Sequence, residues 1–282
     1  MKANILYFLT ISLFLSSCRK EIDLDLPNYI EKIVINGELN SEDNFSLQVS
    51  KSFGINQSFD TLGLLLNTAT VQFYENGALL GNGTYLGGRY TVPFKAQPDT
   101  EYKIVASNAN FRTASATVRT PSALNFSLQY LDSIDKDIDG FRIGQLTFIL
   151  KDVPNQANYY SILVRYYNQP INQWLDYDIV SNDPIFFQTK QTDGSYLFSD
   201  KTFSGNTKTV SINLPYDFTI YSPKFEVLVK SIDADYYTYI QQVQEYNQTG
   251  VGILDNPVIV KSNIKDGLGF VGAISSQKTF VN

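Results

Sequence analysis

The sequence predicts a mainly β protein, with an N-terminal β-sandwich followed by a second β-rich domain that contains one helix. Three observations predict this fold class. The chain has 19 Tyr and 19 Phe but one Met and one Trp, and aromatic residues suit pleated surfaces. Short strand-like runs recur at about ten-residue spacing before Pro121, as in a β-sandwich. Longer strand-like runs with more irregular connections follow it.

The first 17 residues have the layout of an export signal. Lys2 precedes the apolar run Ile5–Leu15, which is followed by two serines and Cys18. About ten apolar residues are too few to cross a hydrocarbon core of roughly 30 Å. The ending Leu-Ser-Ser-Cys is typical of a bacterial lipoprotein signal, so we expect residues 1–17 to be removed and an acylated Cys18 to anchor the chain to a membrane. The alternatives are a secreted protein with one spare thiol, or a buried apolar cysteine.

The composition narrows the classes of function. The chain has 22 Lys and Arg, 28 Asp and Glu and no His, which gives a formal net charge of −6. Without histidine, the commonest general base and metal ligand is missing, and an acylated Cys18 leaves neither a thiolate nucleophile nor a disulfide. We therefore expect no enzyme. A glycosidase that uses two carboxylates stays open, although no spacing singles out a pair. The acidic balance argues against nucleic-acid binding.

The predicted elements begin with an extended tether over residues 18–30, where acidic and apolar residues alternate up to Pro27. Residues 31–120 follow as an immunoglobulin-like or carboxypeptidase-regulatory-like β-sandwich. Asn76-Gly77 and Asn82-Gly83 predict tight hairpin turns, because both dipeptides favour left-handed backbone. The strand-like runs of this domain include Lys32–Gly37, Phe45–Ser52, Thr68–Tyr74, Glu101–Asn108 and Thr113–Thr120.

Residues 121–282 are predicted to form the second β-rich domain. One segment departs from the period of two and predicts a helix near residues 234–248, with Asp233 and Asp235 as good N-terminal caps. The glycine-rich segment Val260–Ala273 predicts a backbone bend that leads into a closing C-terminal strand. The apolar face of the helix contains Tyr236, Tyr239, Ile240, Val243 and Tyr246.

Asp135, Asp137 and Asp139 precede Gly140 and match the first half of a calcium loop, in which oxygen ligands alternate before a sharp turn. The twelfth position of this loop is Leu146 instead of the bidentate glutamate of a complete loop. The sequence therefore leaves two interpretations: a partial calcium site completed by another strand, or an acidic solvated loop. Calcium titration by calorimetry distinguishes them.

Trp174 and Tyr177 lie in the polar and aromatic segment "YNQPINQWLDYD". Such side chains can stack on sugar rings or anchor a protein partner. We take both as candidate ligand-binding residues, with structural packing as the alternative.

Three stretches together carry a resemblance to a known family. They are "EIDLDLP" and "IVINGEL" after Cys18, the Tyr-rich predicted helix, and the terminal "SNIKDGLGFVGA". They resemble a family of outer-membrane lipoproteins of unknown function found in Bacteroidota, whose genes often lie beside those of TonB-dependent transporters. The resemblance implies location and association with a transporter, and it brings no catalytic residues.

The expected function is that of a non-catalytic, lipid-anchored accessory or binding protein of the outer membrane that partners a TonB-dependent transporter in uptake. Glu21 and Asp23 are similar to the signal that sends such lipoproteins to the cell surface. The alternative is a surface glycan-binding or adhesive lipoprotein that acts alone. No cofactor is expected apart from the calcium considered above.

Overall fold

The computed structural model describes residues 29–54, 62–136, 138–140, 142–179, 181–186, 190–215, 224–248 and 258–281. In this part the protein is mainly β with one α-helix, α2, which confirms the predicted fold class. No helix among these residues is long and apolar enough to cross a membrane.

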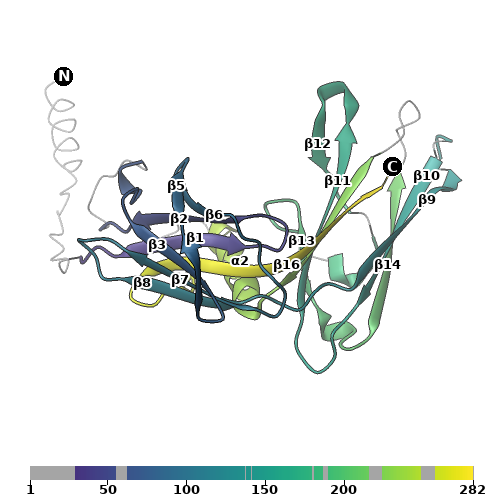
Figure 1. Cartoon of the computed structure of the whole chain (residues 1–282). Coiled ribbons are helices and arrows are strands. Elements are labelled where there is room, and N and C mark those ends of the chain that lie inside the picture. The colour runs from purple at the N-terminus through teal and green to yellow at the C-terminus, as the bar shows by residue number, and fades with distance from the viewer. Residues whose placement is uncertain are drawn as a thin grey trace, which may run out of the picture. The chain divides into compact units, whose positions relative to one another are not determined.

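The largest sheet has nine strands in the order β12-β11-β15-β16-β1-β2-β6-β5, and β13 pairs with β11 beside this path (Figure 1). The bounds of these strands are β1 Ile33–Leu39, β2 Phe45–Lys51, β5 Thr84–Leu86, β6 Arg89–Val92, β11 Tyr159–Asn168, β12 Gln173–Asp176, β13 Tyr196–Ser199, β15 Phe225–Ile232 and β16 Leu268–Val281.

Two smaller sheets complete the architecture: a four-stranded sheet in the order β4-β3-β7-β8 and a three-stranded sheet in the order β14-β10-β9. Helix α2 spans Ala234–Gln248. The bounds of the remaining elements are β3 Thr70–Glu75, β4 Ala78–Asn82, β7 Glu101–Ser107, β8 Ala114–Arg119, β9 Phe126–Lys136, β10 Arg142–Lys151 and β14 Thr207–Pro215, with short 3₁₀ turns at Leu62–Leu64, Gln169–Ile171, Pro184–Phe186 and Asp200–Thr202.

Each half of the large sheet packs on one of the smaller sheets and encloses a separate hydrophobic core. The first core lies between the β1 half and the four-stranded sheet, and in it Phe45 meets Tyr102 edge to face at a centroid distance of 5.1 Å. The second lies between the β11 half and the three-stranded sheet, and includes Phe148 and Phe225. Buried and part-buried residues alternate along β2 and β10, as expected of strands with one face in a core.

Strand β16 belongs to both halves of the large sheet. Its residues 268–273 pair with β1 in parallel, and residues 274–281 pair with β15 in the antiparallel direction. The strand accordingly runs between the two halves in yellow in Figure 1. The buried residues of the first core come from β1, β2, β3, β6, β7 and β8 and from Ala69, Ala96, Ile264, Val271 and Ala273.

Asparagine side chains complete the hydrogen bonding at the start of β16. The Phe270 backbone N–H donates to Oδ1 of Asn36 at 3.1 Å. Asn263 acts like a short neighbouring strand, because its Oδ1 accepts from the Val271 N–H at 3.0 Å and its Nδ2 donates to the Val271 carbonyl at 2.7 Å. The side chains supply partners to backbone groups that would otherwise be buried without them.

The structure corrects one of the two predicted hairpin turns. Asn76 and Gly77 have φ of 48° and 84°, as predicted for the turn between β3 and β4. Gly83, in contrast, is not left-handed, because the chain crosses there from the four-stranded sheet to the large sheet. Its small size serves close packing instead: a Cβ at Gly83 would lie 3.1 Å from both the Phe73 ring and the Tyr90 side chain.

Candidate functional site

Helix α2 forms where predicted, and Asp233 fixes its beginning. Oδ1 of Asp233 accepts the backbone N–H of Tyr236 at 2.9 Å, as an N-cap does. Oδ2 of the same carboxylate accepts the backbone N–H of Ala273 at 2.9 Å, near the point where β16 leaves β1 and joins β15. Burial raises the pKa of Asp233 above its ordinary value of 3.8. One carboxylate thus holds both the helix and the shared strand.

Replacing Asp233 with alanine should lower the free energy of unfolding by about 2 kcal/mol, because the cap and the partner of the Ala273 N–H are both lost. A raised pKa means that the folded state binds the proton more tightly than the unfolded state, so wild-type stability falls as pH rises from 3.8 through the raised value. The cost of the substitution should therefore be larger near the acid end of this window than at neutral pH. Urea unfolding of the wild type and of Asp233→Ala at several pH values measures this difference in the free energy of unfolding.

Asp235→Ala is the matched control for this prediction. Asp235 lies in the first turn of the same helix, but its carboxylate is exposed and pairs with the Lys261 ammonium at 2.6 Å. Exposed pairs contribute roughly 0–1 kcal/mol. Equal costs for the two substitutions would show that Asp233 does not have the capping role assigned to it.

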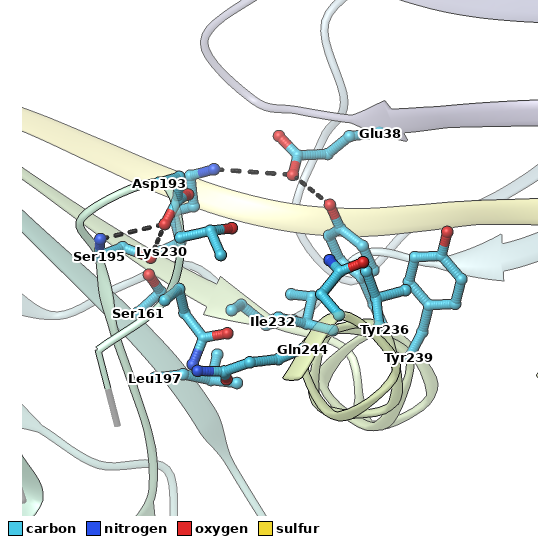
Figure 2. A pocket seen from close by; sticks show the side chains of 15 residues that line it. Glu38, Ser161, Asp193, Ser195, Leu197, Lys230, Ile232, Tyr236, Tyr239 and Gln244 are labelled. Atoms are coloured by element: carbon cyan, nitrogen blue, oxygen red, sulfur yellow. Dashed lines mark hydrogen bonds and ion pairs between the residues drawn. The ribbon is translucent and has the colours of Figure 1, made fainter. Parts of the chain in front are cut away.

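A pocket of about 230 Å³ lies between helix α2, the outer face of the large sheet and the segment 191–195 (Figure 2). Its aliphatic side chains come from β13, β15 and α2. Its polar side chains come from five separate segments, including β1. The lining includes the aliphatic residues Leu197, Ile232, Ile240 and Val243 and the polar or charged residues Glu38, Ser161, Asp193, Lys230, Gln244 and Asn247.

Glu38, Lys230 and Tyr236 form the charged corner of the pocket. The Tyr236 hydroxyl donates to Oε2 of Glu38 at 2.9 Å, and Nζ of Lys230 lies 3.6 Å from the same oxygen. Burial, reinforced by the Glu38 carboxylate, raises the pKa of Tyr236, so the phenol stays protonated and able to donate. Figure 2 shows both contacts converging on Glu38.

Ser161 and Lys230 lie opposite each other on β11 and β15 and face the pocket. Within the described residues, the Ser161 hydroxyl has no hydrogen-bond partner, and Lys230 has only the long contact with Glu38. Ser161 is nevertheless 95% buried, with 5% exposed. The sheet thus presents two neighbouring donors whose hydrogen-bonding capacity is not filled.

Asp193 provides a second carboxylate at the exposed rim of the pocket. Its Oδ1 accepts from the backbone N–H and the hydroxyl of Ser195, at 3.0 and 2.7 Å, while Oδ2 has no partner within the described residues. Gln244, on the opposite wall, donates to the Lys190 carbonyl at 2.9 Å and ties the helix to this segment.

Tyr236 and Tyr239, two aromatic residues of the pocket lining, stack on Phe270 of β16. Tyr239 stacks on Phe270 at a centroid distance of 4.2 Å, and Tyr236 stacks on the same ring at 5.8 Å. Tyr236 also lies directly on the backbone of Gly272, where a Cβ would be 2.4 Å from the ring. These contacts fix the two tyrosine rings in the wall of the pocket, beside its four aliphatic side chains.

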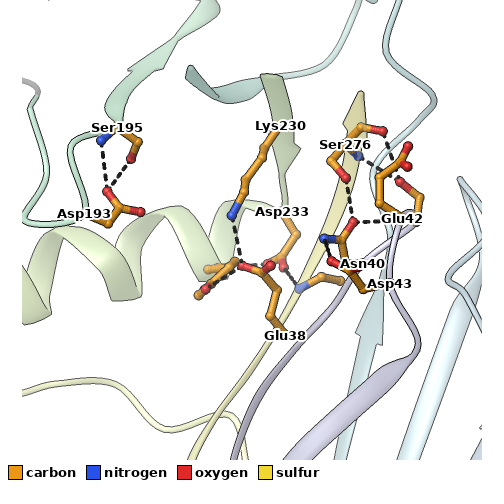
Figure 3. Close-up of polar contacts among 12 residues, drawn as sticks. Glu38, Asn40, Glu42, Asp43, Asp193, Ser195, Lys230, Asp233 and Ser276 are labelled. Carbon is orange, nitrogen blue, oxygen red and sulfur yellow. Dashed lines mark hydrogen bonds and ion pairs between the residues drawn. The ribbon is translucent and has the colours of Figure 1, made fainter. Parts of the chain in front are cut away.

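Polar contacts next to the pocket fix the path of β16 (Figure 3). The Ser276 N–H donates to the Ser41 hydroxyl at 2.9 Å, and the Ser276 hydroxyl donates to Oδ1 of Asn40 at 2.5 Å. Asn40 and Ser41 directly follow β1, so β16 keeps contact with this segment after the backbone pairing with β1 ends. Glu38, which lines the pocket, belongs to β1, and Asp233 caps the helix that forms one wall of the pocket.

The structure places two of the three residues of the predicted calcium loop. Asp135 is at the exposed end of β9, where its Oδ1 accepts the backbone N–H of Lys136 at 2.8 Å. Asp139 lies in the turn before Gly140, whose φ of 84° provides the sharp turn predicted there. Asp137 lies outside the described residues. In the part that is described, no three acidic, histidine or cysteine side chains gather as a metal site. Calcium binding at this loop stays a prediction.

The two candidate aromatic residues lie in different environments. Trp174 is on β12, paired with Tyr167 of β11, and is 36% exposed. Its ring contacts Tyr167 and Phe280 at centroid distances of 5.4 and 6.0 Å, and these three rings form a surface cluster. Tyr177 instead packs against the second core, edge to face with Phe225 at 6.3 Å. The structure does not bring the two predicted residues together.

The burial of Tyr177 gives a prediction for alkaline pH. Burial raises the pKa of Tyr177 from 10.0 to about 12. The contribution of the buried, protonated Tyr177 to the free energy of unfolding is therefore fully present below pH 10 and is lost as pH rises towards 12. Titration of tyrosinate absorbance should show a late-ionising group that disappears in Tyr177→Phe, and this variant should lose less stability over that pH range. Ionisation of Tyr177 at its ordinary value of 10.0 would contradict the prediction.

The pocket is not predictable from the sequence pattern. Tyr236, Tyr239, Ile240 and Val243 were recognisable as a helix face, but their partners Glu38, Ser161 and Lys230 lie on three distant strands. One signal was available: Lys230 interrupts the apolar run of β15, whose neighbours are buried. A charged residue within such a run marks a position that faces away from the core. The signal does not identify the residues that surround it.

The fold and the pocket define a two-core β-sandwich protein in which a shared strand and one helix frame a small polar and aliphatic site. The model of the family described as "Domain of unknown function (DUF4249)" matches residues 19–279, and the chain belongs to this family. No curated protein matches the chain.

Two solved structures show local similarity. A mutant of Salmonella alpha-2-macroglobulin is 11% identical with a TM-score of 0.26, and the match covers 76% of this chain and 14% of that one. Fibronectin(III)-like modules of Clostridium thermocellum CbhA are 12% identical with a TM-score of 0.23, and the match covers 73% of this chain and 87% of that one. At these scores neither similarity bears on function.

Proposed function

We propose that the protein is a non-catalytic, lipid-anchored binding protein of the outer membrane that works with a TonB-dependent transporter in uptake. The Leu-Ser-Ser-Cys sequence at Cys18 supports the anchor, although Cys18 lies outside the described residues. The resemblance to envelope lipoproteins encoded beside such transporters supports the partner. The family membership over residues 19–279 is compatible with both.

The observation that carries the non-catalytic part of the proposal is the state of the charged groups in the pocket. Glu38 is engaged by the Tyr236 hydroxyl and faces the Lys230 ammonium, and Asp193 is oriented by Ser195. Ligand-binding sites typically combine an apolar surface with a few polar side chains that are held in place.

Affinity purification of the lipidated protein from native membranes tests the partnership. We expect a β-barrel transporter to copurify in stoichiometric amount. Mass spectrometry of the purified protein should show an acylated Cys18 at its N-terminus, and Cys18→Ala should move the protein out of the membrane fraction. An unmodified thiol, or a retained leader, would contradict the anchor.

The surface cluster of Tyr167, Trp174 and Phe280 favours one second candidate, a surface glycan-binding protein that acts alone. Trp174 is 36% exposed and Phe280 is 56% exposed, and exposed aromatic rings can stack on sugars. Retention on polysaccharide affinity gels without any copurifying barrel would favour this candidate, and Trp174→Ala should then abolish the retention.

A further inference from the structure

The pocket beside α2 combines features that select one chemical class of ligand. Two of its polar groups are donors on the sheet: the Lys230 ammonium and the Ser161 hydroxyl, directly opposite each other on neighbouring strands. Neither has its hydrogen-bonding capacity filled within the described residues. An ammonium next to a hydroxyl is suited to accept a carboxylate through charge-assisted hydrogen bonds.

The same pocket also presents negative charge. Glu38 and Asp193 both line it, and Oδ2 of Asp193 has no partner within the described residues. The three charged side chains of the lining thus comprise two carboxylates and one ammonium. A ligand that carried only a carboxylate would meet two like charges, whereas a ligand with an additional ammonium group would complement them.

The size and the apolar lining restrict the ligand further. Leu197 and Ile232 on the sheet and Ile240 and Val243 on α2 provide an aliphatic surface. The Tyr236 and Tyr239 rings, which also line the pocket, each stack on Phe270. A volume of about 230 Å³ is below the roughly 300–1,000 Å³ typical of sites for drug-sized molecules.

We propose that this pocket binds a small zwitterionic amino acid with an aliphatic side chain. Its carboxylate contacts Lys230 and Ser161, its ammonium group faces the carboxylates of Glu38 and Asp193, and its side chain packs against the α2 wall. The inference rests on the proposed binding function, for which it names the class of ligand.

Calorimetry with the purified full-length protein and L-leucine tests this assignment. Binding with a dissociation constant below about 1 mM is expected. Leucine amide, which lacks the carboxylate, and isocaproate, which lacks the ammonium group, should each bind at least about tenfold more weakly. Equal binding of either analogue, or no binding of L-leucine, would overturn the proposal.

Lys230→Met should weaken L-leucine binding at least about tenfold. Its matched control is Lys278→Met: Lys278 lies on β16, on the same face of the large sheet but outside the pocket, and its ammonium is a similar 3.7 Å from Glu226. The control should bind L-leucine normally. If Lys230→Met fails to fold, as judged by circular dichroism, Ser161→Ala tests the same contact. Binding of glucose or maltose that Lys230→Met abolishes would show a sugar site and overturn the proposal.

The test of L-leucine binding and the test of transporter copurification can fail independently. A transporter that copurifies with Lys230→Met as well as with the wild type supports the accessory role whatever the pocket binds. Copurification without any L-leucine binding would therefore remove only the ligand assignment. If the wild-type protein binds L-leucine but no transporter copurifies with it, the proposed partnership is wrong and the ligand assignment stands.

Discussion

Replacing Gly269 with alanine should lower the free energy of unfolding by about 3–5 kcal/mol, because two costs combine at this position. The φ of Gly269 is +98°, a conformation that residues with a Cβ adopt only with strain. A Cβ there would also lie 2.3 Å from the carbonyl oxygen of Ile35 and 2.7 Å from Oδ1 of Asn36. The clash falls on the parallel pairing of β16 with β1, so relief requires separating these strands.

Gly77→Ala separates the two costs. Gly77 has a φ of +84°, but no atom lies within 4 Å of the position that its Cβ would occupy. This control should cost only the roughly 1–2 kcal/mol of a left-handed residue. Urea unfolding of both variants gives the comparison. Equal losses would mean that close packing of β16 on β1 contributes little.

Asp152→Ala is expected to cost about 3 kcal/mol, because it leaves the buried Tyr160 hydroxyl and the part-buried Gly205 backbone N–H without their acceptor. Asp152 is 4% exposed. Its Oδ1 accepts the Tyr160 hydroxyl at 2.5 Å and its Oδ2 accepts the Gly205 backbone N–H at 2.6 Å. The carboxylate therefore links the end of β10 to β11 and to the turn before β14. Chemical denaturation of the purified protein measures the loss.

Tyr160→Phe is the partner variant in a double-mutant cycle with Asp152→Ala. It removes one of the two hydrogen bonds and leaves the Gly205 contact in place, so its cost should be smaller. In the double variant the two costs should not add, because the removed groups share one interaction. Strict additivity would show that the Tyr160 hydrogen bond contributes nothing to stability.

The sequence pattern predicts the local elements well where the period is clear. The spacing of Tyr236, Tyr239, Ile240 and Val243 predicts α2, and the glycines of residues 260–273 predict the bend before β16. These predictions hold because side-chain periodicity and glycine content act on the few residues around them. Asn82-Gly83 shows the limit, since a dipeptide that suits a hairpin also suits a crossover between sheets.

The pairing of distant segments was not predictable from the pattern. Asn36 and Phe270 are in contact although they are 234 positions apart, and nothing in a run of alternating residues specifies its neighbouring strand. The same reason hides the pocket, since Glu38 reaches it only because β1 pairs with β16. Asn36 and Asn263 give a partial indication, because amide side chains in or beside strand-like runs often form hydrogen bonds to backbone groups. They do not identify the partner strand.

The shared strand has a consequence for how the protein is made. Until β16 has been synthesised, one side of β1 has no neighbour, and its N–H and C=O groups are an open edge that can pair with other chains. Domains usually fold in order as they are produced. Here the N-terminal sandwich is complete only after β16, at the end of the chain, has been synthesised. The nascent chain therefore keeps this edge open until its last residues are made, and a chain truncated before residue 268 should aggregate.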